Sequence, residues 1–198
     1  MSLLTKLKTA QNKIPKQIRL FLGKAFLFFV VWKIIYNVFL YDAKYLDRAL
    51  TAHVGNASVT LINSLGAMNG FVSKREINKY NYEEGIILVE ESAIYHNGHK
   101  VLNIANVCNG LELMVLYMGF IICMPSTFFR KLLYIILGLI VLDGINILRC
   151  VGLIYLREYY AIYFQFAHHY LFNAMVYTGT FIMWILYCRK IQFKNETP

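Results

Sequence analysis

Four long apolar runs, each bounded by basic or polar residues, constrain the fold of this 198-residue chain more than any other feature. They cover residues 20–41, 104–124, 131–153 and 163–187. About 20 consecutive, mainly apolar residues are needed for a helix to cross the hydrocarbon core of a bilayer. The sequence therefore predicts an all-α polytopic membrane protein with about four transmembrane helices.

The composition supports this prediction. Hydrophobic residues make up 58% of the chain, against roughly 45–50% in soluble proteins. Lysine and arginine outnumber aspartate and glutamate by 20 to 11. Because the basic residues stand mainly at the ends of apolar runs, we interpret them as topology determinants and expect no nucleic-acid binding. No small-residue cleavage site follows the first run, so we expect a retained span rather than a signal peptide.

The distribution of basic residues predicts the orientation. They gather in a leader at residues 1–19, in the loop at Arg130 and Lys131, and in the C-terminal tail. Loops rich in lysine and arginine stay cytoplasmic. We therefore expect a single integral-membrane domain, residues 1–198, in the plasma (inner) membrane with both termini cytoplasmic. Residues 42–103 then form an extracytoplasmic loop.

Two kinds of structure are predicted in the outer loop. Apolar residues at helical spacing over residues 44–65 indicate one or two amphipathic helices at the membrane surface. Apolar stretches at residues 85–89 and 100–102 flank Asn97-Gly98, a dipeptide typical of tight hairpin turns. We expect a small β-hairpin that leads directly into the second span.

Three of the apolar runs carry a chemically reactive or charged side chain near the predicted outer surface. Cys108 lies about one turn after the start of the second run, Arg149 near the outer end of the third, and His168 and His169 near the outer start of the fourth. With about 1.5 Å of rise per residue, the predicted topology brings them to a similar depth on the same side. A thiol, a guanidinium and an imidazole are thus predicted to lie together, with the site facing outward.

These residue types suit nucleophilic catalysis. The thiolate is the nucleophilic form of cysteine, and an adjacent histidine can take the thiol proton. Arginine stays charged and offers fixed donors to a substrate carbonyl or to a tetrahedral oxyanion. Each residue also has a structural interpretation, because Cys108 could simply fill space, Arg149 could extend to the interface, and His168 could be interfacial. Geometry alone leaves both interpretations open.

The sequences around these residues are similar to those of a known family. Three motifs follow in order: Asn106-Val107-Cys108-Asn109-Gly110-Leu111, then Asn146-Ile147-Leu148-Arg149, then His168-His169-Tyr170-Leu171-Phe172 with Tyr177. They resemble the Cys-x-Gly, Asn-x-x-Arg and last-helix histidine signatures of the exosortase/archaeosortase family, especially its short exosortases. The resemblance covers about residues 101–184. Two features depart from it: many relatives have an acidic residue where this chain has Asn106, and full-length members have more spans.

The resemblance implies a membrane-embedded cysteine transpeptidase or protease. Such enzymes act on membrane-tethered proteins that carry a C-terminal sorting signal, and they are thought to transfer the cleaved protein to a surface acceptor, here an unknown glycan or lipid. By motif match, Cys108 would be the nucleophile, Arg149 the carbonyl or oxyanion group, and His168 the general acid/base.

The choice between the two histidines stays open at this point. Motif alignment favours His168, whereas the helix wheel favours His169, which shares a face with Asn173 and Tyr177. We predict His168 because the start of this helix can be irregular, and we keep His169 as a supporting candidate.

Other polar residues are supporting candidates. Asn109 and Asn146 belong to the matched motifs. Lys33, Glu112 and Asp143 are ionisable residues within predicted spans, where such residues are usually paired or functional. We expect them to pair across the first three spans and to hold the bundle together. The rival interpretation is a small transporter or a non-catalytic membrane scaffold that uses these three charges.

The sequence gives little support for a metal site. His96 and His99 bracket the predicted hairpin turn, but no third ligand is evident from the sequence. The four cysteines form no CxxC pair, which argues against a zinc site or a disulfide framework. We therefore expect no metal and no cofactor. The expected partners are the lipid bilayer and membrane-tethered protein substrates.

Overall fold

The computed structural model describes residues 16–36, 45–66, 69–82 and 85–189. In chain order its elements are α2 (Lys16–Ile35), α3 (Tyr45–Ser64), β1 (Phe71–Tyr82), β2 (Gly85–His96), β3 (His99–Ile104), η2 (Asn106–Cys108), α4 (Leu111–Cys123), α5 (Phe128–Tyr159), α6 (Ala161–Phe166), η3 (Ala167–Leu171) and α7 (Phe172–Cys188). The described part is mostly helical, with one small antiparallel sheet.

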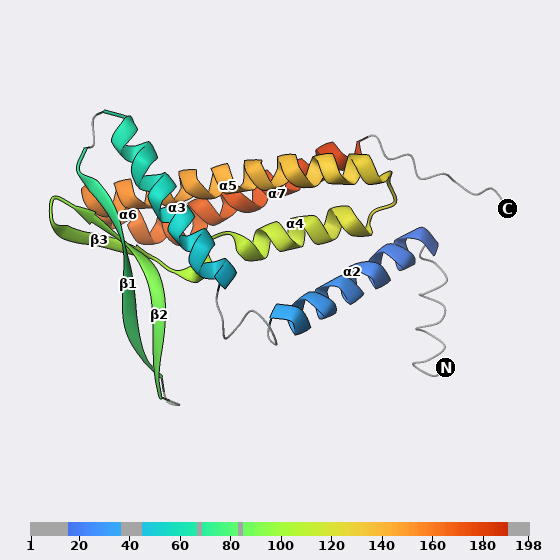
Figure 1. Cartoon of the computed structure of the whole chain (residues 1–198). Helices are drawn as coiled ribbons and strands as arrows, with labels where there is room; N and C mark the ends of the chain where they lie inside the picture. Colours follow the sequence, from blue (N-terminus) through green and yellow to red (C-terminus); the bar gives the residue numbers. More distant parts are fainter. Residues whose placement is uncertain (1–15, 37–44, 67–68, 83–84, 190–198) are drawn as a thin grey trace, which may run out of the picture.

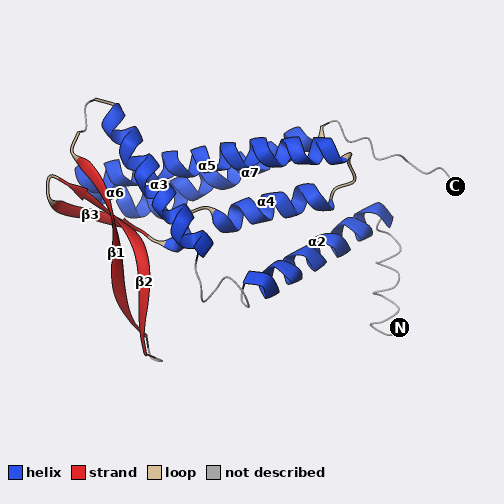
Figure 2. Ribbon diagram, in the orientation of Figure 1, coloured by secondary structure: helices blue, strands red, loops and turns tan. Residues whose placement is uncertain are grey.

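Helices α4, α5 and α7 run alongside one another, and the sheet and α3 lie at one end of this bundle (Figures 1 and 2). We call that end the sheet end. The opposite end, near Arg130 and Tyr187, is the tail end. Helix α2 runs beside α4 on the outside of the bundle.

Two helical stretches are long and apolar enough to cross a membrane, namely α5 (32 residues) and the continuous stretch Ala161–Cys188 (28 residues). Helix α4 is apolar but has only 13 residues. Helix α2 has 20 residues, among them Arg19, Lys24 and Lys33. Large apolar side chains point outward from the long helices, for example Ile140 and Phe181, which are 64% and 60% exposed. Such exposure is expected of helices that contact lipid rather than water.

The tail end of the bundle is held by close packing around two buried tyrosines. Tyr117, Leu142 and Tyr187 form its buried core, which joins α4, α5 and α7. Gly138 on α5 faces the Tyr117 ring so closely that any side chain there would overlap it. The Tyr117 hydroxyl donates a hydrogen bond to the Tyr134 carbonyl oxygen (2.8 Å). A small residue is therefore needed at position 138 for α4 and α5 to approach.

The predicted hairpin is present. Strands β2 and β3 pair antiparallel and meet at Asn97 and Gly98, with His96 opposite His99. Asn97 has φ 48° and Gly98 has φ 88°, the positive values that a two-residue type I′ turn requires. This turn chemistry explains why Asn-Gly allowed the hairpin to be recognised from sequence.

Strand β1 was not predicted. It pairs with β2 in register from Phe71 opposite His96 to Tyr82 opposite Gly85. Among its described side chains only Phe71 is buried, and the strand is rich in charged and polar residues. Strand prediction depends on alternating burial, and a strand with one buried side chain gives no such pattern.

Helix α3 is a single helix that packs on the sheet and on α5. Its buried face is mixed: Asp47, Thr51 and Ser58 are polar, whereas Val54, Val59 and Ile62 are apolar. By contrast, Leu46 and Leu65, two of the apolar residues that suggested an amphipathic helix, are 45% and 57% exposed. The helix therefore buries a mixed polar and apolar face against the rest of the protein and leaves these two leucines exposed, where they can contact a membrane surface.

A second buried core fixes the sheet and α3 to α5. It includes Val54 and Ile62 from α3, Phe71 and Ile94 from the sheet, and Ile154 from α5. The sheet end thus forms one packed unit with the last turns of α5. Cys108 packs against this unit.

Candidate active site

Cys108 lies in a 3-10 turn, ahead of the helix in which the sequence suggested it. Strand β3 continues to Ile104, η2 ends at Cys108, and α4 begins only at Leu111. The Cys108 N–H donates to the Ala105 carbonyl oxygen (2.9 Å), which closes the turn. The thiol-bearing residue is half-buried. The nucleophile candidate is therefore held on a short irregular segment between a strand and a helix.

The next two residues explain why a Cys-x-Gly sequence suits this turn. The Asn109 side-chain oxygen accepts a hydrogen bond from the Leu111 N–H (2.9 Å), and its amide donates to Asp47 Oδ1 (2.9 Å). Gly110 has φ 82°, and a Cβ there would lie 3.3 Å from the Asn146 amide. A side chain at position 110 would be disfavoured both by the left-handed conformation and by this contact. The turn after Cys108 is consequently rigid.

One face of α5 holds Cys108 at two points. Asn146 and Arg149 are three residues apart and so lie on the same side of the helix. The Asn146 amide donates to the Cys108 carbonyl oxygen (3.1 Å), and Arg149 Nη2 lies 4.0 Å from Cys108 Sγ. The structure thus brings together four residues of the first two sequence motifs, Cys108, Asn109, Asn146 and Arg149.

Arg149 also has an unused donor. Its Nε is buried and has no hydrogen-bond partner among the described residues. The side chain borders a cavity of about 190 Å³ between α4, α5 and α7. A buried donor without a partner is unfavourable, and a carbonyl oxygen entering this cavity could satisfy it. The arrangement is chemically suited to bind a carbonyl beside a thiol.

His168 lies in η3, a π-helical segment at the start of the last helix. Its ring stacks on Phe164 (centroids 5.8 Å apart, planes 5° apart), and Arg149 lies within electrostatic range of it. His169 is exposed, whereas His168 is partly buried. The π-helical turn interrupts the regular helical register on which the helix-wheel preference for His169 depends. Among the described residues, neither histidine is hydrogen-bonded to the Cys108 thiol.

The structure gives Asp143 a different partner from the one expected. Its carboxylate lies 2.9 Å from His53 Nε2 on α3, and no ion pair joins it to Lys33. Among the described residues, Lys33 forms no salt bridge, and its Nζ lies 5.9 Å from the Phe29 ring centroid. The expected three-way pairing is wrong for Asp143 because α3, whose position the sequence did not reveal, packs on α5 and supplies the closer partner.

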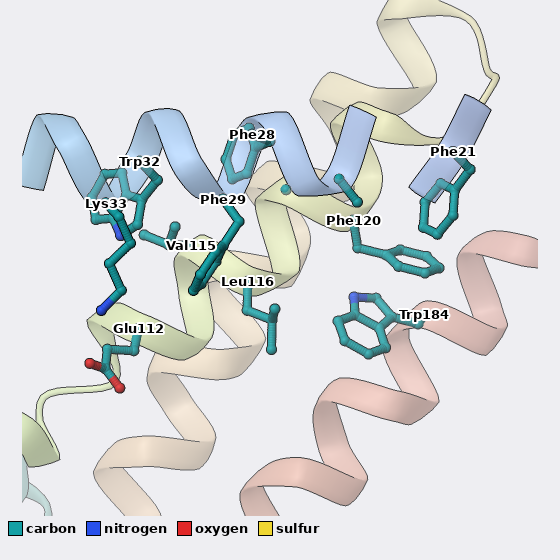
Figure 3. Close-up of a pocket in the computed structure, with 12 residues that line it drawn as sticks. Phe21, Phe28, Phe29, Trp32, Lys33, Glu112, Val115, Leu116, Phe120 and Trp184 are labelled. Carbon is teal, nitrogen blue, oxygen red and sulfur yellow. The ribbon is translucent and has the colours of Figure 1, made fainter. Parts of the chain in front are cut away.

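Lys33 and Glu112 instead border an aromatic cavity of about 360 Å³ between α2, α4 and α7. Figure 3 shows the Lys33 side chain extending toward Glu112 at one end of this cavity, with Phe120 and Trp184 at the other. Glu112 also borders the cavity beside Arg149. A largely apolar path along α4 therefore ends at a charged residue near the Cys108 turn.

Two residues of α3 support the site and were missed from sequence. Asp47 is buried and accepts hydrogen bonds from Tyr36 Oη (2.8 Å) and from the Asn109 amide. Thr51 donates to the Asn106 side-chain oxygen (2.8 Å). Asp47 and Thr51 are four residues apart on one helix face, and that polar face was the available clue. Asn106, where relatives are often acidic, is thus an acceptor in this network.

These features define a class of protein: a membrane protein whose apolar helices present a thiol beside a guanidinium at one end. The model of the family Transmembrane exosortase (Exosortase_EpsH) matches residues 16–187, which include every described helix and strand except the last residue of α7. The chain belongs to the transmembrane exosortase family, as the three sequence motifs suggested. No curated protein and no solved structure gives a significant match to the chain.

Proposed function

We propose that this protein is a membrane-embedded cysteine transpeptidase or peptidase that cleaves the C-terminal sorting signal of exported proteins and transfers them to a surface glycan or lipid. Family membership supports a sorting role. The observation that carries the chemical proposal is the Arg149 guanidinium, 4.0 Å from the Cys108 thiol, at the edge of a cavity. A scaffold or transporter has no need for this pairing.

In the first half of the proposed reaction, His168 takes the proton of the Cys108 thiol and the thiolate attacks the scissile carbonyl carbon. Arg149 donates hydrogen bonds to the oxyanion that forms. Collapse of the tetrahedral intermediate breaks the peptide bond, and the protonated His168 gives its proton to the leaving amine. The product is a thioester on Cys108. Catalytic hydrogen bonds are often longer before substrate binds, which agrees with the separate positions of thiol and imidazole.

In the second half, a hydroxyl or amine of the acceptor, or water, attacks the thioester carbonyl. His168 takes the proton of the attacking group, and the Cys108 thiolate leaves and recovers that proton. Arg149 stabilises the second oxyanion in the same position as the first. This scheme needs no cofactor, and it uses only residues from η2, α5 and η3.

The aromatic cavity along α4 is the proposed contact site for apolar side chains of the substrate's transmembrane helix. It is lined mainly by apolar side chains and lies between α2 and the bundle (Figure 3). A substrate helix there would end near Glu112, next to the Arg149 cavity. The scissile peptide, which precedes the helix of a sorting signal, would then reach Cys108.

The proposed topology has four spans in the inner membrane, both termini in the cytoplasm and the sheet end outside. Reporter fusions at the C-terminus and at the Phe129–Arg130 position should read as cytoplasmic. A fusion at Gly98, in the hairpin turn, should read as external. A cytoplasmic Gly98 would place the site on the wrong side for exported substrates.

The experiment that tests the proposed function follows loss of the C-terminal helix from a co-expressed substrate. Cys108→Ala should abolish processing while the protein still inserts and folds, because Cys108 is half-buried and the change is small. Cys108→Ser should be nearly as inactive, since a hydroxyl is much harder to deprotonate than a thiol.

Cys123→Ala and Cys188→Ala are the matched controls and should process substrate normally, because both residues pack at the tail end. Normal processing by Cys108→Ala would rule out the cysteine mechanism. The scaffold or transporter interpretation would then take its place.

A further inference from the structure

A compact group of possible metal ligands lies at the far side of the sheet end from Cys108. His96 and His99 flank the hairpin turn, and Glu158 comes from the last turn of α5. Glu158 Oε1 lies 2.7 Å from His96 Nδ1 and 3.0 Å from His99 Nε2. We call these three residues the turn cluster. The third ligand that the sequence did not reveal is thus supplied by a helix that begins far downstream in the chain.

We propose that the turn cluster binds one divalent transition-metal ion, with Zn²⁺ the best fit, through His96 Nδ1, His99 Nε2 and the Glu158 carboxylate. The possible ligand atoms all lie within 4.8 Å of one another. Zinc bonds of about 2.0–2.2 Å to nitrogen and oxygen at a tetrahedral centre place ligand atoms about 3.3 Å apart. The separations of Glu158 Oε1 from the two histidine nitrogens, 2.7 Å and 3.0 Å, are close to this, so small side-chain shifts of the two histidines suffice. The fourth position is left for water.

The ligand types select the class of metal. Two imidazoles and one carboxylate suit zinc and neighbouring transition metals. Calcium and magnesium prefer sites made mainly of oxygen ligands, in greater number than the single carboxylate of the turn cluster provides. The site is therefore expected to take Zn²⁺ or Co²⁺ and to discriminate against Mg²⁺.

The surroundings of His96 suit a metal ligand. A metal bound at Nδ1 requires the ring proton on Nε2, and the Asn69 carbonyl oxygen lies 3.3 Å from that nitrogen. Metal-bound histidines usually donate their second N–H to such an acceptor. The ring also stacks on Phe71 with centroids 4.1 Å apart and planes within 7°. His96 is consequently held with Nδ1 directed at Glu158.

The opposite tautomer of His96 also has its partners in place. With the proton on Nδ1, the ring donates to Glu158, and Nε2 can accept from Asn97 Nδ2 at 3.2 Å. Metal binding would move the single proton of the neutral ring from Nδ1 to Nε2 through solvent, so that a bond to Asn69 replaces the bond to Asn97. The exchange leaves no ring nitrogen without a partner, and this keeps both states favourable.

The burial of the cluster allows an ion to enter without unfolding. His96 and Glu158 have side chains only 11% and 14% exposed, whereas the His99 side chain is 57% exposed. The site thus has two sheltered ligands and one open side. Entry from solvent past His99 requires no movement of the sheet.

A bound ion would brace the two elements that hold the candidate active site. Strand β3 begins at His99 and leads through Ile104 to the turn that carries Cys108. Glu158 and Arg149 lie on the same helix, α5. A metal bridge between the hairpin turn and the end of α5 would therefore limit movement of β3 relative to Arg149. This metal bridge does not depend on the proposed peptidase activity.

The test measures metal binding directly. The purified, metal-stripped full chain with Cys108→Ala, which removes a competing thiol, is titrated with Zn²⁺ by calorimetry and with Co²⁺ by absorption. The expected result is one ion per chain, a d–d spectrum typical of a tetrahedral site without sulfur ligands, and a higher unfolding temperature with Zn²⁺. His99→Ala, at an exposed position, should weaken binding at least tenfold and remove the thermal shift. Glu158→Gln should also weaken Zn²⁺ binding and reduce the thermal shift.

His53→Ala is the matched control. His53 also pairs with a carboxylate, that of Asp143, but it does not belong to the turn cluster. It should bind Zn²⁺ as tightly as its parent. A double change of His168 and His169 to alanine should likewise leave binding intact. Failure of the parent chain to bind Zn²⁺ would overturn the proposal. Equal binding by the parent and by His99→Ala, or loss of binding in the His168/His169 double variant, would do the same.

Discussion

The two ends of the helical bundle are stabilised by different kinds of interaction. At the sheet end, the buried Asn109 amide donates a hydrogen bond to buried Asp47, and the buried Asn146 amide donates to the Cys108 carbonyl oxygen. At the tail end, Tyr117 and Tyr187 are buried by apolar and aromatic neighbours. The backbone differs as well, since the sheet end has a 3-10 turn, a glycine with φ 82° and a π-helical turn. The tail end consists of regular helices.

The difference supports the proposal that the sheet end carries the active site. Burying a polar group is unfavourable unless it is hydrogen-bonded, and irregular helical turns are frequently found at functional sites. A bundle that needed only stability would use tail-end packing throughout. The sheet end instead uses a buried asparagine, Asn146, to fix the carbonyl of one cysteine.

Removal of the proposed acid/base should have the largest effect. His168→Ala should slow substrate processing by about 10²–10⁴-fold, the usual contribution of general acid–base catalysis. His169→Ala should stay close to the wild-type rate because His169 is exposed. Both rates come from the substrate-processing assay with equal membrane levels of each variant. A larger loss in His169→Ala would transfer the proposed role to that residue.

Replacement of the guanidinium should be nearly as damaging. Arg149→Lys keeps the charge but loses the planar set of donors, so processing should fall by about 10²–10³-fold, as for loss of an oxyanion donor. Arg75→Lys, at an exposed position on β1, is the control and should retain activity. If Arg149→Lys processes substrate at the normal rate, a charge alone is sufficient and the oxyanion role is wrong.

Loss of a hydrogen bond at the sheet end should lower both stability and substrate processing, whereas loss of one at the tail end should lower stability alone. Asn109→Ala leaves the buried Asp47 oxygen without its Asn109 partner and should lower the free energy of unfolding by about 1–3 kcal/mol, together with activity. Tyr117→Phe removes the bond to the Tyr134 carbonyl and should cost about 0.5–1.5 kcal/mol with processing unchanged. Thermal unfolding and the processing assay report the two quantities. An Asn109→Ala protein with full activity would separate the network from catalysis.

The smallest expected effect concerns pH and the solvent-exposed face of the sheet. The hydrogen bond from Lys100, and then that from Tyr95, holds the pKa of Glu76 below its usual value. A depressed carboxyl pKa adds stability above the unfolded-state pKa of about 4.3, and this stability is lost as the pH falls through the folded-state value. Wild type should therefore exceed Glu76→Gln in unfolding temperature at neutral pH by a small margin that shrinks on acidification. A margin independent of pH would show that Glu76 contributes no charge effect.

The sequence predicted the parts of this structure that depend on local rules. The Asn97-Gly98 turn follows from its φ requirements, and counting residues along apolar runs placed Cys108 and Arg149 at one depth. Parts that depend on long-range packing were not predictable. Glu158 joins His96 only because the sheet folds onto α5, and Asp143 meets His53 only because α3 does the same. The start of α4 was also misjudged, because apolar residues of β3 and η2 looked like a continuation of the helix.

If Cys108 forms a covalent thioester with the substrate, mass spectrometry of the trapped protein should detect it. Enzyme and substrate are mixed, quenched with acid and digested. We expect a substrate-derived adduct on the peptide that contains Cys108, and hydroxylamine should release it, as it does other thioesters. Cys123 and Cys188 should carry none. Processing accompanied by an adduct on a different residue, or by a Cys108 adduct that resists hydroxylamine, would contradict the proposed mechanism.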